Sequence, residues 1–166
     1  MPKRWTLINL IGLSLLLTAC GWQLRNAQLL PDSIGSVYLS SKQSHSSLVK
    51  ELSQAIDQFG VQVASSSSQA EQSFMIVDYK QSRRISTLNS SARVAEYQLD
   101  ERVDYLILDS NGKPLAPLAT ASAQKTYEFD ENDILGSTNE QQRVKQRLHE
   151  AIARQMLTHL NAVANR

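Results

Sequence analysis

Apolar and polar side chains alternate along the middle of the chain. Between positions 94 and 108, one set of alternate positions is largely apolar: Ala95, Tyr97, Leu99, Val103, Tyr105 and Ile107. The intervening positions from 96 to 104 are polar: Glu96, Gln98, Asp100, Arg102 and Asp104. Because successive side chains of a strand point to opposite faces of a sheet, this pattern predicts a strand with one packed face and one hydrated face.

A turn and a return strand are expected to follow. Asn111-Gly112 predicts a tight hairpin turn, since both residues tolerate positive φ. The chain then returns through residues 115–129. Pro114 and Pro117 cannot donate hydrogen bonds to a neighbouring strand, so the beginning of the return strand should be irregular or lie at an edge.

Two earlier segments also have the character of strands. Residues 34–39 alternate apolar and small side chains, and residues 74–84 begin with an apolar run. Between them, residues 64–73 read ASSSSQAEQS. Such a segment buries little apolar surface, so we expect a mobile loop there.

Two segments have helical periodicity instead. Apolar residues recur at helical spacing at Leu48, Leu52, Ile56 and Phe59. Ser46 or Ser47 is expected to cap this helix, and Gly60 to take the left-handed conformation just past its end. A longer helix is expected over residues 139–164, with one apolar stripe: Val144, Leu148, Ile152, Met156, Leu160 and Val163.

These elements predict an α+β fold for residues 34–166 as one domain. We expect a two-layer sandwich, with a mainly antiparallel four- to five-stranded sheet and two amphipathic helices on one face. The other face of the sheet stays open and polar. It is either available to a partner or simply hydrated, and the pattern alone does not choose between these alternatives.

The first nineteen residues have the layout of a secretory signal. Lys3 and Arg4 precede an apolar run over residues 7–17, and small residues follow. The run is well short of the ~20 residues that a membrane-spanning helix needs. Residues 1–19 are therefore expected to be a cleaved signal peptide.

Cys20 is the only cysteine in the 166-residue chain, so it cannot form an intramolecular disulfide. The segment Leu17-Thr18-Ala19-Cys20 resembles the bacterial lipobox, in which the cysteine is acylated, for example with palmitate, after cleavage. The alternative is a buried or reactive thiol. Several acyl chains anchor a protein durably. Residues 20–33 would then form a lipidated tether, and Gly21, which is not acidic, implies sorting to the outer membrane.

Charge argues against nucleic acid as a partner. Of 17 basic and 16 acidic residues, loss of Lys3 and Arg4 leaves 15 basic residues and a net charge of −1. Nucleic-acid-binding domains usually carry a basic excess or stripe.

The sequence offers little support for catalysis, metal binding or a cofactor. His45, His149 and His159 lack the spacing of a metal site, and neither a nucleophile elbow nor a phosphate-binding glycine loop is present. The acidic cluster at residues 130–133 lacks the glycine that a calcium loop requires, and is better explained as a turn before the last helix. We therefore expect a protein that is not an enzyme.

Four basic residues lie within or directly beside residues 81–92, which are expected to connect two strands: Lys80, Arg83, Arg84 and Arg93. Guanidinium groups at a strand tip suit phosphates, because each donates paired hydrogen bonds to anionic oxygens. The alternative is an ordinary hydrated loop, which charge alone favours.

Three segments resemble the LptE family of lipopolysaccharide-assembly lipoproteins: CGWQLR from Cys20, VAEYQL from Val94 and LGSTNE from Leu135. The order and spacing of the predicted elements are similar as well. The resemblance implies a binding protein that sits as a plug in the β-barrel protein LptD and helps lipopolysaccharide reach the outer leaflet.

The resemblance also implies basic residues that contact lipopolysaccharide phosphates. At the matching positions this chain has Ser90 and Ser137, which are uncharged. Arg83, Arg84 and Arg93 lie near enough in sequence to substitute for them. Two alternatives remain: an outer-membrane lipoprotein that activates a peptidoglycan synthase, against which the short tether counts, and an unrecognised hydrolase.

Overall fold

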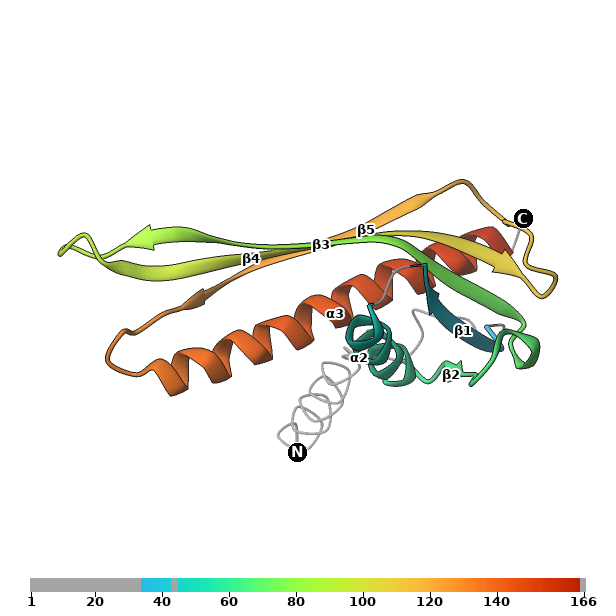
Figure 1. The fold of residues 1–166 in the computed structure, drawn as a ribbon, viewed down its shortest axis with the longest axis horizontal. Helices are drawn as coiled ribbons and strands as arrows, with labels where there is room; N and C mark the ends of the chain where they lie inside the picture. The colour runs from blue at the N-terminus through green and yellow to red at the C-terminus, as the bar shows by residue number, and fades with distance from the viewer. Residues whose placement is uncertain (1–33, 43–44, 165–166) are drawn as a thin grey trace, which may run out of the picture.

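The computed structural model describes residues 34–42 and 45–164. Its strands are β1 (Ser36–Ser41), β2 (Gln62–Val63), β3 (Gln72–Leu88), β4 (Val94–Asp109) and β5 (Ala119–Glu128). Its helices are α2 (Ser46–Asp57), the short 3-10 helix η2 (Ser67–Gln69) and α3 (Ile134–Ala164). Figure 1 shows the elongated, curled sheet that they form with the helices beneath it.

The five strands form one sheet in the order β2-β1-β3-β4-β5. β1 is parallel to both of its neighbours, whereas β3 with β4 and β4 with β5 are antiparallel. Most of the paired residues lie in the two antiparallel ladders. The structure thus confirms the predicted α+β fold, with a mixed sheet in which the long strands are antiparallel.

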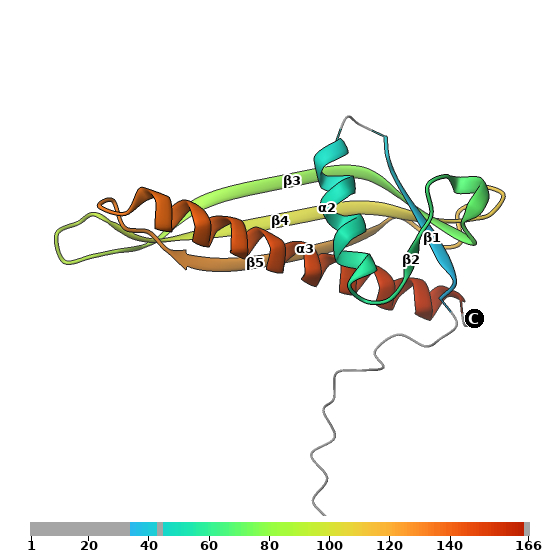
Figure 2. The same cartoon turned by 90° about the horizontal axis from the view of Figure 1, so that it is seen from below.

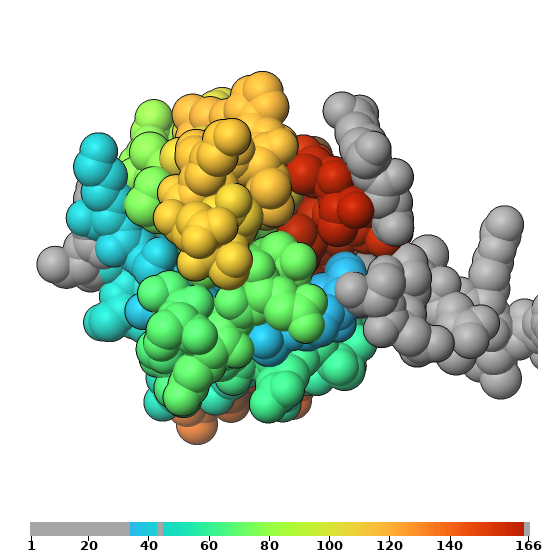
Figure 3. Space-filling view, turned by 90° about the vertical axis from the view of Figure 1, so that its right-hand side faces the viewer, coloured from blue at the N-terminus to red at the C-terminus, as the bar shows by residue number. Residues whose placement is uncertain are grey.

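Both helices pack on the same face of the sheet (Figure 2). The core between the layers is built from alternate residues of β1, β3 and β4 and from one stripe of each helix. On α3 the buried stripe includes five of the predicted positions: Val144, Leu148, Ile152, Met156 and Leu160. Figure 3 shows the end of the molecule where the turn after β4 (yellow) lies beside the segment that leads into β3 (green).

The helix ends differ in part from the prediction. No side-chain hydrogen bond caps the start of α2, which follows His45, so the predicted serine cap is wrong. Gly60 has the predicted positive φ, at 79°. α3 begins at Ile134 rather than near Asn139, because the Asp133 carboxylate accepts the Gly136 N–H at 2.9 Å and so extends the helix toward the acidic turn.

The serine-rich segment is partly regular. It contains η2, its Ala70 is buried, and β3 already begins at Gln72. β3 also continues to Leu88, several residues beyond the predicted end. β5 begins only at Ala119, after a single bridge between Leu108 and Pro114, so the irregular start of the return strand is confirmed.

The turns after β3 and β4 share one design. Asn89 Oδ1 accepts the N–H groups of Ser91 and Arg93, each at 3.0 Å. Asp109 Oδ1 accepts the N–H groups of Asn111 and Lys113 at 2.9 and 2.8 Å. The fourth position of each turn has positive φ, at 59° in Ala92 and 77° in Gly112. Asn111 is not left-handed, so the turn differs from the predicted two-residue type.

Ala92→Gly is therefore expected to stabilise the protein. The left-handed conformation costs an L-residue about 1–2 kcal/mol, of which the greater unfolded-state freedom of glycine cancels about 0.5–1 kcal/mol. The reciprocal change Gly112→Ala should destabilise the protein. A Cβ at position 112 would have no atom within 4 Å, so this variant tests the backbone conformation alone. Urea unfolding of both variants measures this, and shifts of the same sign would contradict it.

Tyr105 is expected to make the stability of the fold depend on pH in the alkaline range. The side chain is buried, its hydroxyl lies 3.1 Å from His159 Nδ1, and burial raises its pKa from 10.0 to about 12. Above pH 10 the unfolded chain loses this proton while the folded chain keeps it, so stability should fall by about 1.4 kcal/mol per pH unit until about pH 12. Urea unfolding at pH 9 and 11 measures the fall. Tyr105→Phe should reduce it, and an unchanged slope would contradict the assignment.

The predicted signal peptide, Cys20 and the tether lie outside the described residues. Within the described part of the chain, no helix is both long and apolar enough to cross a membrane.

Candidate functional site

The distal halves of β3 and β4 form an arm, residues 81–99, whose tip extends past the ends of β5 and α3 (Figure 1). Every residue at positions 81–90 is exposed. These include two large apolar side chains, Ile85 at 55% and Leu88 at 53% exposure. The tip of the arm therefore presents apolar and basic groups together.

The predicted connection at residues 81–92 is mostly strand, because β3 continues to Leu88, so the connection is shorter than predicted. Arg83 and Arg84 lie in β3, paired with Leu99 and Gln98 of β4. Arg93 alone follows the turn. The reason is that cross-strand pairing with β4 orders a polar segment that has little strand character of its own.

The three arginines contact different partners. Arg83 stacks over the Tyr97 ring, 4.3 Å from its centre, on the helix side of the sheet. Arg84 forms an ion pair with Asp100 at 3.3 Å on the open side. Arg93 forms an ion pair with Glu131, in the loop before α3. The structure gathers them on one arm but does not point them at one place.

The two serines at the family's basic positions have separate settings. Ser90 is an exposed residue of the tip turn. Ser137 is buried in the first turn of α3, where its Oγ accepts the Asp130 N–H at 2.9 Å and lies 3.2 Å from the Asp130 carbonyl oxygen. Ser137 thus holds the loop to the helix and has no free group for a ligand.

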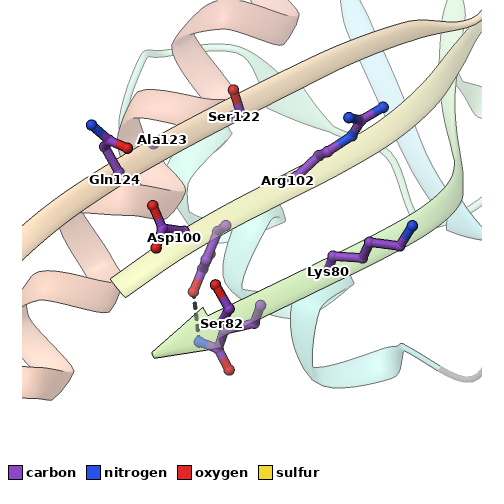
Figure 4. Close-up of a pocket in the computed structure, with 9 residues that line it drawn as sticks. Lys80, Ser82, Asp100, Arg102, Ser122, Ala123 and Gln124 are labelled. Carbon is purple, nitrogen blue, oxygen red and sulfur yellow. Dashed lines mark hydrogen bonds between the residues drawn. The ribbon is translucent and has the colours of Figure 1, made fainter. Parts of the chain in front are cut away.

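The open face of the sheet carries a network of paired polar side chains, and Figure 4 shows those around its central depression. Arg102 contacts both carboxylate oxygens of Asp104, at 3.1 and 3.3 Å. The Thr120 hydroxyl donates to the same carboxylate at 2.6 Å and is the main cause of the lowered pKa of Asp104. This face is polar, as predicted, and its charges are largely matched from within.

Glu101 is a residue that the alternation did not assign to either face. It lies on the helix side of β4 and is 2% exposed. Its Oε1 accepts the Gln81 Nε2–H at 2.8 Å, and its Oε2 lies 2.9 Å from His149 Nε2 of α3. His149 Nδ1 in turn lies 3.2 Å from Glu51 of α2. Glu101 therefore ties the sheet to α3, and through His149 to α2.

This buried series of polar side chains affects Tyr79 as well. Burial and the nearby Glu101 carboxylate raise the pKa of Tyr79 above its ordinary value of 10.0. Among the described residues, no group of three or more histidine, cysteine or acidic side chains is arranged to hold a metal ion. The polar groups of the interior contact one another and meet the arm at its base, where Gln81 donates to Glu101.

The arrangement of sheet and helices is that of small bacterial lipoproteins. Lipoprotein B from Nitrosomonas europaea is similar over 87% of this chain and 93% of its own, with a TM-score of 0.63 and 23% identity. Rare lipoprotein B from Shewanella oneidensis is similar over 78% and 96%, with a TM-score of 0.59 and 17% identity. A minor lipoprotein from Acinetobacter baumannii is similar over 81% of this chain and 95% of its own, with a TM-score of 0.56 and 20% identity. At these identities the likeness shows a shared fold.

The sequence itself fixes the family. Residues 34–160 match the model of the LptE lipopolysaccharide-assembly family, and the chain belongs to that family. Its role therefore lies in lipopolysaccharide assembly, as a non-catalytic assembly factor. No sequence among the curated proteins matches the chain.

Proposed function

We propose that the chain is an outer-membrane lipoprotein that plugs the LptD β-barrel and helps lipopolysaccharide reach the outer leaflet. The family match over residues 34–160 carries this proposal and favours it over activation of a peptidoglycan synthase. Cleavage before Cys20 and acylation of that cysteine would anchor the protein, with residues 20–33 as a tether.

The open sheet face suits the interior of a barrel. A barrel lumen is polar and hydrated, and a surface placed inside it must be compatible with water. The open face meets this requirement with hydrogen-bonded side chains of β4 and β5, such as Arg102, Asp104 and Thr120.

Lipopolysaccharide is proposed to bind at the arm. Its phosphates would meet Arg83, Arg84 and Arg93, since guanidinium groups donate paired hydrogen bonds to phosphate oxygens. Ile85 and Leu88 expose apolar surface beside them, which suits an acylated ligand. The arm thus combines the two kinds of surface that an amphipathic anionic lipid requires.

Affinity purification of the tagged chain from detergent-solubilised outer membranes tests the plug. We expect a large β-barrel protein to copurify in near-equal amount and to be identified as LptD by mass spectrometry. Recovery of the chain alone, or with a peptidoglycan synthase, would overturn the proposal. The mass of the purified chain tests acylation of Cys20 separately, and a Cys20→Ser variant serves as the control.

A further inference from the structure

β3 has a long free edge. β1 pairs with β3 only from Gln72 to Ile76, although β3 continues to Leu88. After a register shift at Ile76/Asp78, pairing with β4 is unbroken over residues 78–85. In the described part of the chain, this stretch has β4 on one side and no strand on the other, as Figure 1 shows.

The hydrogen-bonding pattern shows which backbone groups reach this edge. The Phe129 N–H donates to the Ala95 carbonyl oxygen, so Ala95 and every second residue after it on β4 face β5. The intervening residues, such as Asp100 and Arg102, face β3 and pair with Ser82 and Lys80. The β3 residues that direct N–H and C=O groups outward are therefore Tyr79, Gln81, Arg83 and Ile85.

The fold caps only part of this edge. The Asp78 carboxylate accepts the Tyr79 N–H at 3.0 Å, but among the described residues no side chain does the same for Gln81, Arg83 or Ile85. The outer edge of β5, on the other side of β4, is capped by a side chain. Gln155 of α3 donates to the Ser122 carbonyl oxygen at 2.9 Å and accepts the Ser122 N–H at 3.2 Å. Exposed backbone groups of a strand edge are a template for another strand.

Charge decides which strand fits. Residues 79–85 contain Lys80, Arg83 and Arg84 and no acidic residue. A second copy of β3 on this edge would place cations beside cations, which disfavours self-pairing. We propose that residues 79–85 of β3 bind an extended acidic strand of a partner protein, which adds to the sheet through main-chain hydrogen bonds. This inference goes beyond lipopolysaccharide binding and concerns the backbone rather than the arginine side chains alone.

The experiment uses the isotope-labelled full chain in detergent micelles and a blocked peptide, TEVEVET, at millimolar concentration. Amide hydrogen exchange is followed by NMR. We expect exchange at Gln81, Arg83 and Ile85 to slow at least tenfold, and exchange at the already paired Lys80, Ser82 and Arg84 to stay unchanged. This alternation is the signature of strand addition, since a purely electrostatic contact does not select alternate amides.

Two controls make the result decisive. A TKVKVKT peptide should give no protection, because its charges repel the edge. Ile85→Pro removes an outward N–H without removing a bond to β4 or an arginine, so peptide binding should weaken at least tenfold, whereas Ile85→Thr should retain it. Equal protection by both peptides, equal binding by both variants, or no alternate protection would overturn the inference. Ile85→Pro and Ile85→Thr both lose the apolar side chain, so lipopolysaccharide binding should change equally in the two variants, whereas peptide binding should differ; this difference separates the test from that of the proposed function.

Discussion

Replacement of His149 by leucine is expected to lower the free energy of unfolding by about 3–5 kcal/mol. His149 Nε2 lies 2.9 Å from Glu101 Oε2, and neither atom has a further hydrogen-bond partner among the described residues. Leucine would leave Glu101 Oε2 in the interior without the imidazole nitrogen that lies beside it. Gln81 would still donate to Oε1, but a buried carboxylate oxygen without a partner is costly, so the loss should exceed that of an ordinary hydrogen bond.

His159→Leu is the matched control on the same helix. His159 accepts from or donates to the neutral Tyr105 hydroxyl at 3.1 Å, so its loss should cost only about 1 kcal/mol. The double variant Glu101→Leu/His149→Leu should recover most of the stability lost in His149→Leu, since apolar replacement of a whole buried pair is often tolerated. Urea unfolding of the wild type, Glu101→Leu, His149→Leu and the double variant measures the coupling. Additive losses would show that the two side chains do not act as a pair.

The case of Glu101 shows what periodicity misses. Its position falls between Leu99 and Val103 on the apolar face, but a charged residue is rarely buried without a partner, and that partner, His149, is 48 positions away in the chain. His149 itself adjoins Leu148 at the edge of the apolar stripe of α3. Only the packing of α3 on the sheet brings the two together.

The prediction of a connection at the arm fails for a related reason. Residues 81–90 are polar except for Ile85 and Leu88 and carry no alternation, so local sequence indicates a connection. Their strand conformation comes from pairing with β4, whose pattern was clear. By contrast, α2, the stripe of α3 and the positive φ of Gly60 depend on residues close in sequence, and these predictions are confirmed. The parallel placement of β1, which leaves one edge of β3 beyond Ile76 without a neighbouring strand, has no local signal at all.

The triple variant Arg83→Ala/Arg84→Ala/Arg93→Ala is expected to bind lipopolysaccharide at least tenfold more weakly. A hydrogen bond to a charged group contributes about 1.5–3 kcal/mol, and part of this is offset because each arginine already has a partner. The fold should persist, since these side chains lie on the surface. Titration of detergent-dispersed lipopolysaccharide, with circular dichroism as the folding check, measures the effect. Unchanged affinity would mean that the three arginines do not take part in lipopolysaccharide binding.

Glu131→Gln provides a test in the opposite direction. The Glu131 carboxylate forms an ion pair with Arg93, and an exposed ion pair of this kind contributes about 0.2–1 kcal/mol of interaction free energy. Removing the negative charge frees the guanidinium and lowers repulsion of an anionic ligand, so lipopolysaccharide should bind about two- to fivefold more tightly. Glu140→Gln removes the same charge from a pair with Arg143 of α3, which is not one of the three arginines, and should change affinity less. An equal gain in both variants would assign the effect to net charge, and only a gain confined to Glu131→Gln places a phosphate at Arg93.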